Sequence, residues 1–458
     1  MFYFLNRYLS KRTLMVWASE SILLYLIALS LTATMDGYGY LAVDFHPLAA
    51  LAVASVYGVV YYYFDLYARE HHSRPSVLFR RLAAATLTAA AGEALLRLAA
   101  GYQIYTVPLD AVLIATAVCL WRAFLARHLE FDVGKGRVMI IGTGDLARKI
   151  GSEIYGDKDH DLELVGFIDD DPEKIGHSIV NPGVIGGYGD IARLAETEGV
   201  DRIIVALADR RSKLPMSALL DCKLKGVSIE EGETFQERMM GKIPLDQLKP
   251  SWLVFSDGFK SLRSRKIIKR VLDMVFSFVL LVAALPVMAL TAVAIKLESR
   301  GPVIFRQTRV GENGRHFEIY KFRSMRQDAE SKTGPVWARE KDDRVTRVGA
   351  FIRKTRIDEL PQLINVLRGD MSFVGPRPER PYFVDQLKEV IPYYEIRTAV
   401  KPGVTGWAQI KYPYGATFKD ALEKLQYDLY YIKNMSPLFD VIIFFRTIKV
   451  VLSRKGAR

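Results

Sequence analysis

The sequence predicts a membrane protein in three parts. These are an N-terminal four-helix transmembrane bundle over residues 1–130, an α/β middle domain over 135–250 and a C-terminal α/β domain over 262–458. Three observations lead to this prediction: four apolar runs near the N-terminus, a strand and helix alternation with closely spaced glycines, and a later hydrophobic run with basic residues on both sides. The 458 residues are enough for two or three domains.

The charge pattern favours a membrane surface or phosphate-bearing ligands. The net charge is +12, and Lys and Arg crowd the edges of the apolar runs. No nucleic-acid recognition motif occurs, so nucleic acid is not a predicted partner. The two cysteines, Cys119 and Cys222, lie far apart and form neither a disulfide framework nor a metal-ligand spacing, which predicts cytosolic soluble parts.

The four apolar runs cover residues 14–34, 45–64, 82–100 and 107–125, each close to the roughly 20 residues that a membrane helix needs. Lys and Arg lie before the first run, between the second and third and after the fourth, but not in the other two connections. Both ends of the bundle are therefore expected in the cytoplasm.

Three charged residues, Glu20, Glu93 and Arg97, lie within these runs. Charges inside a membrane can mark a transport function. Glu93 and Arg97 are spaced i,i+4, however, so we expect a structural ion pair on one helix face instead.

The middle domain carries a Rossmann-like pattern. A strand at 138–141 leads into Gly142-x-Gly144-x-x-Ala147, and a second strand at 162–168 ends in Asp169. This spacing predicts a nucleotide site in which Asp169 meets a ribose. The alternative is a scaffold whose tight turn needs glycine. No Tyr-x-x-x-Lys dyad occurs, which disfavours a nucleotide-sugar oxidoreductase.

The hydrophobic run at 271–295 carries a single charge, Asp273, and would measure roughly 37 Å as a helix. Because basic residues flank both ends, a spanning helix would violate the charge rule. Pro286 interrupts the run and predicts a re-entrant helix over 266–297 that bends and returns. The alternative is a proline-kinked span. Residues 438–452 predict an amphipathic helix at the membrane interface.

The segment 357–379 places an acid pair close to a stiff arginine. Its sequence is IDELPQLINVLRGDMSFVGPRPE, and its apolar spacing predicts a helix over about 359–367 with Asp358 at the N-cap. An ionised Asp358 could attack phosphorus, and Glu359 could hold Mg²⁺. Arg353 and Arg377 could bind phosphate. The alternative is a helix cap with surface ion pairs.

Residues 266–458 resemble the polyprenyl-phosphate glycosylphosphotransferases, the monotopic phosphoglycosyl transferases of exopolysaccharide and O-antigen (lipopolysaccharide) synthesis. The motifs that carry the resemblance are RKTRIDELPQLINVLRGDMSFVGPRPE, YKFRSM and VKPGVTGWAQI. The bundle and the Rossmann-like domain resemble the large members. Small members have Ser-Pro at the membrane break, whereas this chain has Leu285-Pro286.

The resemblance implies transfer of a sugar 1-phosphate from a UDP-sugar, with UDP-glucose or UDP-galactose expected, to undecaprenyl phosphate with release of UMP. It implies Asp358 as the covalent nucleophile and Mg²⁺ on Glu359 and Asp358. Its implied substrate-binding residues are Arg353, Arg377, Lys321 and Arg323.

The implied setting is the bacterial inner membrane, with membrane lipid as a partner, the soluble domains in the cytoplasm and a homo-oligomer allowed. The alternative from another class is a catalytically inactive, membrane-anchored nucleotide sensor or assembly protein. The intact acid pair and arginines favour the enzyme.

Overall fold

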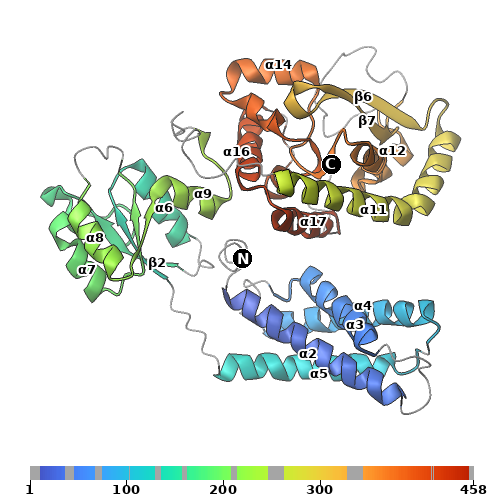
Figure 1. Ribbon diagram of the computed structural model, residues 1–458, viewed down its shortest axis with the longest axis horizontal. Helices are drawn as coiled ribbons and strands as arrows, with labels where there is room; N and C mark the ends of the chain where they lie inside the picture. The colour runs from blue at the N-terminus through green and yellow to red at the C-terminus, as the bar shows by residue number, and fades with distance from the viewer. Residues whose placement is uncertain are drawn as a thin grey trace. The chain divides into compact units, whose positions relative to one another are not determined.

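The computed structural model divides into two compact units, Met1–Gln236 and Glu237–Arg458 (Figure 1). The first unit holds a helical bundle and a parallel sheet, and the second holds two short sheets among helices. The residues that the structure describes are 11–36, 46–67, 75–102, 104–128, 136–156, 162–207, 214–245, 263–326, 344–413, 415 and 417–452.

Four long helices form the N-terminal bundle: α2 (Lys11–Asp36), α3 (His46–Tyr63), α4 (Pro75–Ala99) and α5 (Val107–His128). Helix α2 packs against α3 and α5, and α4 also packs against both. Buried Tyr57 and Tyr61 fill the centre beside small residues such as Ala85 and Ala89. By length and composition α2, α4 and α5 could cross a membrane, whereas the apolar part of α3, Pro47–Tyr63, is shorter.

The charges inside the bundle are paired. Arg97 contacts Glu93 one turn away, and its Nη2 lies 2.6 Å from Asp110 Oδ2. Arg122 Nε lies 2.5 Å from Glu20 Oε1. A charge removed from water is costly unless it is paired, so these contacts confirm the predicted structural pairing of Glu93 and Arg97.

The middle domain is a parallel sheet with the strand order β3-β2-β1-β4-β5. Its strands are β1 (Gly136–Ile141), β2 (Leu162–Ile168), β3 (Val184–Gly186), β4 (Arg202–Val205) and β5 (Ser228–Glu231). Its helices are α6 (Asp145–Gly156), α7 (Ile191–Thr197), α8 (Met216–Leu224) and α9 (Gly232–Met240). Helices α7 and α8 cover one face of the sheet and α6 the other (Figure 1). This order is the doubly wound one, so the α/β sheet agrees with the sequence prediction.

Glycine is required directly after β1. Gly142 has φ +109°, and a Cβ there would lie 2.7 Å from the carbonyl oxygen of Ala206. At Gly144 a Cβ would meet nothing within 4 Å. The first glycine is therefore demanded by the turn itself.

The second unit opens with α11 (Arg263–Glu298), followed by an antiparallel hairpin of β6 (Ile304–Val310) and β7 (His316–Phe322). After the hairpin come α12 (Arg347–Lys354), η6 (Ile357–Glu359), α13 (Gln362–Arg368), β8 (Ser372–Val374), α14 (Pro381–Val390), η7 (Tyr394–Ala399), β9 (Gly403–Thr405), α15 (Trp407–Lys411), α16 (Phe418–Asn434) and α17 (Pro437–Leu452). Strand β8 pairs with β9 in parallel.

The first half of α11 is held by polar contacts to the rest of this unit. Asp273 accepts hydrogen bonds from Ser372 Oγ at 2.8 Å and from the Phe373 amide at 3.0 Å. Arg270 donates to the carbonyl oxygens of Val366 and Leu367 at 2.6 and 2.8 Å, which satisfies the last turn of α13. Helix α11 is thus fixed directly to α13.

Beyond these contacts α11 is apolar and exposed. Leu290 is 73 % exposed and Phe278 60 %. Pro286 lies within the helix, and the later part of α11 turns away from the first part (Figure 1). Length and composition would also permit α11 to cross a membrane. The bend at a proline agrees with the sequence, and the re-entrant course stays a prediction.

Helix α17 confirms the helix expected over 438–452, but its acid does not face water. Asp440 is 4 % exposed. It accepts hydrogen bonds from Lys269 at 2.8 Å and from Tyr431 Oη at 2.7 Å. This buried charge joins α17 to α11 and α16.

The two units meet within α9, after Gln236. Glu237 pairs with Lys433 at 2.6 Å, and Trp407 Nε1 donates to the Gly241 carbonyl at 2.7 Å. The sequence-based boundaries at 130–135 and 250–262 fall in segments outside the described residues.

Candidate active site

Asp358 and Glu359 lie in the single turn η6, directly after Arg356, which has the left-handed values φ 56° and ψ 17°. Helix α13 begins only at Gln362, with Pro361 at its N-cap. The prediction that Asp358 caps this helix is therefore wrong. A left-handed non-glycine residue is uncommon and often marks a functional turn.

Glu359 is surrounded by cations from three segments. Arg377 Nη2 lies 2.6 Å from its Oε1, Lys321 Nζ lies 3.4 Å from the same oxygen, and Arg356 Nη1 lies 3.8 Å from Oε2. The Glu359 side chain is only 12 % exposed. These contacts bring together Lys321 from β7 and Arg377 from the loop after β8.

Burial shapes the protonation of this cluster. Burial alone would raise the pKa of Glu359, but Arg377 and Lys321 outweigh it and hold that pKa well below its usual range. Burial lowers the pKa of Lys321, and the Glu359 carboxylate opposes that shift. We therefore treat Glu359 as an ionised carboxylate clamped by cations.

Asp358 stands in contrast to its neighbour. Within the described part of the chain, its carboxylate makes neither a hydrogen bond nor an ion pair. Burial and the charge of Glu359 raise its pKa to about 6, against the opposing effect of Lys321, Arg377 and Arg353. A half-buried carboxylate without a partner is available for chemistry and remains largely ionised at neutral pH.

The other two predicted arginines differ from each other. Arg353, in the last turn of α12, is half-buried and is one of the cations that act on Asp358. Arg323 is buried, and its guanidinium donates to the carbonyl oxygens of Ser299 and Arg300 at 2.8 and 3.0 Å. Arg323 therefore holds the chain just after α11, and we leave it out of the substrate site.

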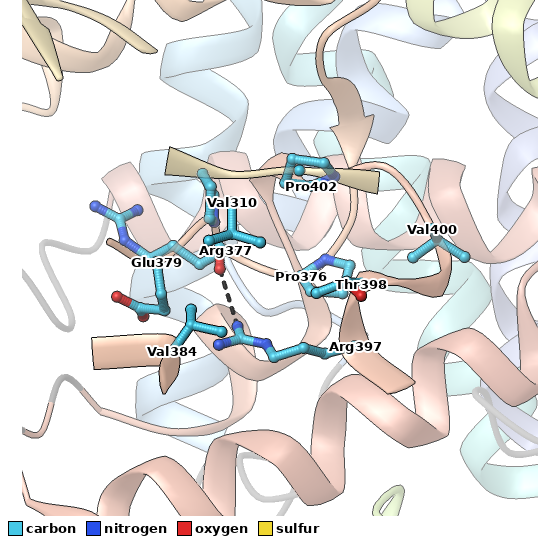
Figure 2. Close-up of a pocket in the computed structure, with 11 residues that line it drawn as sticks. Val310, Pro376, Arg377, Glu379, Val384, Arg397, Thr398, Val400 and Pro402 are labelled. Atoms are coloured by element: carbon cyan, nitrogen blue, oxygen red, sulfur yellow. Dashed lines mark hydrogen bonds between the residues drawn. The ribbon is translucent and has the colours of Figure 1, made fainter. Parts of the chain in front are cut away.

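A second arginine, Arg397, hydrogen-bonds to the backbone of Arg377. Arg397 Nη2 donates to the Arg377 carbonyl at 2.9 Å and lies 3.0 Å from Asp428 Oδ2 (Figure 2). Figure 2 shows Arg397 in a pocket lined also by Pro376 and Glu379. Its contacts with Tyr394 and Asp428 fix the guanidinium.

Sequence reasoning missed Arg397 and Asp428. Asp428 carried a usable signal, because it lies among the buried apolar residues Leu425, Leu429 and Ile432 of α16. An acid on the apolar face of a helix predicts a buried partner. Arg397 stands in no motif, and only the fold brings it to Arg377.

The donor set is compatible with a magnesium ion that takes most of its ligands from substrate and water. Such an ion needs one or two carboxylates. Asp358 and Glu359 supply two, and no group of three or more His, Cys, Asp and Glu side chains suited to a metal occurs among the described residues.

The predicted nucleotide residues of the middle domain are also placed. Asp169 is buried at the end of β2 and accepts from Thr143 Oγ1 at 2.5 Å, Lys174 Nζ at 3.1 Å and the Asp171 amide at 3.1 Å. Burial would raise the pKa of Asp169, but the bonds from Thr143 and the neighbouring donors lower it overall. Its oxygens are already bonded within the domain.

Two protein families match parts of the chain. Residues 264–454 match the family described as bacterial sugar transferase, and residues 62–214 match one described as a CoA-binding domain. The exopolysaccharide production protein PSS of Rhizobium leguminosarum bv. phaseoli is 41% identical over 193 residues, which cover 41% of this chain and 96% of that protein. The chain belongs to the bacterial sugar transferase family.

Two larger relatives carry more specific names. The UDP-N-acetylgalactosamine-undecaprenyl-phosphate N-acetylgalactosaminephosphotransferase of Aeromonas hydrophila is 46% identical over 243 residues, 52% of this chain and 56% of that protein. The UDP-glucose:undecaprenyl-phosphate glucose-1-phosphate transferase of Escherichia coli (strain K12) is 46% identical over 187 residues, 40% of each chain. The matched parts span about half the length of these relatives.

Proposed function

We propose that this protein is an undecaprenyl-phosphate sugar phosphotransferase. It transfers a sugar 1-phosphate from a UDP-sugar to undecaprenyl phosphate and releases UMP, as the first membrane step of a bacterial polysaccharide. The observation that carries the proposal is the contrast within η6: the Asp358 carboxylate has no hydrogen bond or ion pair among the described residues, while Glu359 beside it is paired with Arg377 and Lys321. Family membership and the names of the relatives support it.

In the first half-reaction, an oxygen of Asp358 attacks the phosphorus that carries the sugar. A new oxygen–phosphorus bond forms, and the bond from that phosphorus to the bridging oxygen breaks. UMP leaves with the electron pair, so no proton transfer is needed. Arg353 and Arg377 face the developing negative charge, and the cations around Glu359 keep the site positive.

In the second half-reaction, undecaprenyl phosphate takes the place of UMP. One of its phosphate oxygens attacks the same phosphorus, and the bond to Asp358 breaks, which restores the carboxylate. Two polyanionic substrates thus never occupy the site together. The same arginines serve both steps.

Bound Mg²⁺ would be held by Glu359 and Asp358 and would neutralise phosphate charge. The chain's own residues do the rest. Arg397 and Asp428 hold the backbone of Arg377, and Lys321 keeps Glu359 ionised and oriented.

The proposed setting is the bacterial inner membrane with the soluble domains in the cytoplasm. The basic flanks of α11, the proline within it and the turn of its later part away from the first part (Figure 1) support a helix that enters and returns on one face. Single cysteines introduced at Arg265 and Arg300 should both be protected from a membrane-impermeant label in intact cells and labelled in inverted vesicles. Labelling of either one from the periplasm would exclude the re-entrant course.

The identity of the transferred sugar is the most specific part of the proposal. One relative is named for N-acetylgalactosamine and another for glucose. A panel of UDP-glucose, UDP-galactose and UDP-N-acetylgalactosamine, assayed by UMP release in membranes with undecaprenyl phosphate, identifies the donor.

The covalent route has its own test. Protein incubated with the accepted UDP-sugar, labelled in the sugar, and no lipid acceptor should retain label at Asp358 after quenching. It should also release up to one equivalent of UMP. Turnover with acceptor but no adduct, without ping-pong kinetics, would favour direct transfer.

A further inference from the structure

Gln362, the first residue of α13, buries a polar group that nothing satisfies. It is 2 % exposed, and its Nε2 has no hydrogen-bond partner in the part of the chain that the structure describes. Most buried polar groups are bonded, because an unpaired one costs folding free energy. An unpaired amide beside a candidate nucleophile therefore calls for an acceptor that belongs to the reaction.

Burial on this helix does not force an amide to be unpaired. Asn365, one turn later on α13, is 0 % exposed and fully bonded. Its Oδ1 accepts from the Tyr320 amide at 3.0 Å, and its Nδ2 donates to the Glu318 carbonyl at 2.7 Å. The Asn365 side chain thus hydrogen-bonds α13 to β7, whereas the Gln362 amide makes no such bond among the described residues.

Asp358 and Gln362 are four residues apart on one helical path. After η6, Leu360 has φ −55° and ψ −37°, and Pro361 has φ −62° and ψ −17°, so the helical turn continues into α13. The backbone bonds here run from Leu360 to Ile357 and from Leu363 to Leu360, so the path is tighter than a regular α-helix. Asp358 and Gln362 are neighbours one turn apart on this path, and Gln with Asp is a pair known to hydrogen-bond at such spacings. Both side chains lack a hydrogen bond, among the described residues, and each offers what the other needs.

We propose that the Gln362 amide donates a hydrogen bond to the Asp358 oxygen that does not attack phosphorus. The role rests on the proposed function, in which Asp358 is the nucleophile. In the free protein the two side chains do not meet, and a side-chain rotation when the UDP-sugar binds makes the bond.

The chemistry needs such a group. Asp358 has two equivalent oxygens and rotates freely about its terminal bond. When one oxygen forms the bond to phosphorus and UMP departs, the other becomes the carbonyl oxygen of the acyl phosphate. It accepts a hydrogen bond before and after the step. The amide therefore orients the nucleophile rather than neutralising charge, which makes Gln362 a positioning residue.

The test compares two amides of the same helix in the full-length protein. Gln362→Met keeps the length of the side chain and removes the donor, and Asn365→Leu does the same at the bonded position. Melting temperature, the rate of UMP release without acceptor and the KM for the donor are measured for each. The donor is UDP-glucose or UDP-N-acetylgalactosamine, whichever the wild type turns over.

We expect Gln362→Met to melt at or above the wild-type temperature while UMP release falls about 10- to 100-fold with KM within about twofold. Asn365→Leu should melt lower and keep the rate per folded molecule within about threefold. The Gln362 variant is thus expected to lose rate without losing stability, and the Asn365 variant to lose stability without losing rate. Gln362→Asn, which keeps the amide but shortens its reach, should show an intermediate rate.

Three results overturn the role. An unchanged rate in Gln362→Met, or a lower melting temperature or failure to fold, makes Gln362 a packing residue. A raised KM at constant rate makes it a donor-binding residue. If the wild type turns over with acceptor but forms no adduct, both the covalent route and this role of Gln362 are wrong. If the wild type forms the adduct and the Gln362→Met variant is unaffected, only this role of Gln362 is wrong.

Discussion

Two carboxylates that the sequence singles out, Asp169 in the middle domain and Asp358 in the second unit, have opposite surroundings. Asp169 accepts three hydrogen bonds, and its pKa is lowered. Asp358 accepts none among the described residues, and its pKa is raised. A sequence motif can therefore lead to a carboxylate that is already hydrogen-bonded within its domain or to one that makes no hydrogen bond among the described residues, and the partners of the carboxylate distinguish the two.

The largest expected effect is at the open carboxylate. Asp358→Asn should lower turnover at least about a thousandfold, because an amide is a far poorer nucleophile. The melting temperature at pH 8 should stay level or rise, since an unpaired charge is removed from a half-buried site. Steady-state UMP release and differential scanning fluorimetry on the same preparation check both. Full turnover in this variant would contradict the nucleophile assignment.

Glu359 differs from both of these carboxylates, because it is ion-paired and is also proposed to act in catalysis. Glu359→Gln should lower turnover about a hundredfold and also lower the melting temperature, since Arg377 and the buried Lys321 lose their carboxylate. Arg377→Lys serves as the control from the other side of the pair, with a loss of about tenfold because an ammonium lacks the planar fork. Equal melting temperatures for Glu359→Gln and the wild type would show that the clamp is weak.

The closed carboxylate should respond in the reverse way. Asp169→Asn should reduce the free energy of unfolding by about 1–3 kcal/mol and leave turnover within about twofold. Because the pKa of Asp169 is lowered in the folded state, its stabilisation is present above the ordinary aspartate pKa and is lost as the pH falls through the lowered value. The difference in the free energy of unfolding between the wild type and Asp169→Asn should therefore become smaller at acid pH. Chemical denaturation of both proteins at neutral and acid pH measures it.

The smallest effect is expected at Gly144. A Cβ there meets nothing within 4 Å, so Gly144→Asp should leave the fold intact. Turnover should change by no more than about twofold. If the glycine turn binds a phosphate-bearing ligand, the added carboxylate should abolish any thermal stabilisation by CoA. A wild type that CoA does not stabilise would mark this turn, like Asp169, as scaffold.

The elements that the sequence predicted well are those with a strong local period. The apolar runs became α2 to α5, and the strands at 138–141 and 162–168 became β1 and β2. Local pattern also located the acid pair. It misplaced the helix start, because Ile357–Glu359 form a separate 3-10 turn after the left-handed Arg356, and α13 begins only at Gln362 with Pro361 at its N-cap.

The partners in the site were beyond local reasoning. Glu359 meets Lys321 and Arg377, which are 38 and 18 positions away, and only the packing of β7 and the loop after β8 brings them together. The same holds for Arg397, which reaches the Arg377 carbonyl from η7. The unpaired amide of Gln362 can be recognised only when every neighbour is known.

The hydrogen bonds from Arg270 to the last turn of α13 have a further consequence. Helix α13 begins three residues after Glu359 and ends at the arginine of α11, a rise of roughly 10 Å. If α11 enters the membrane as proposed, the candidate nucleophile Asp358 is thereby held at a fixed height above the part of α11 that enters the bilayer. Lipids would then be sorted by the depth at which the bilayer presents their phosphate, and the length of the polyprenyl tail would matter only through that depth.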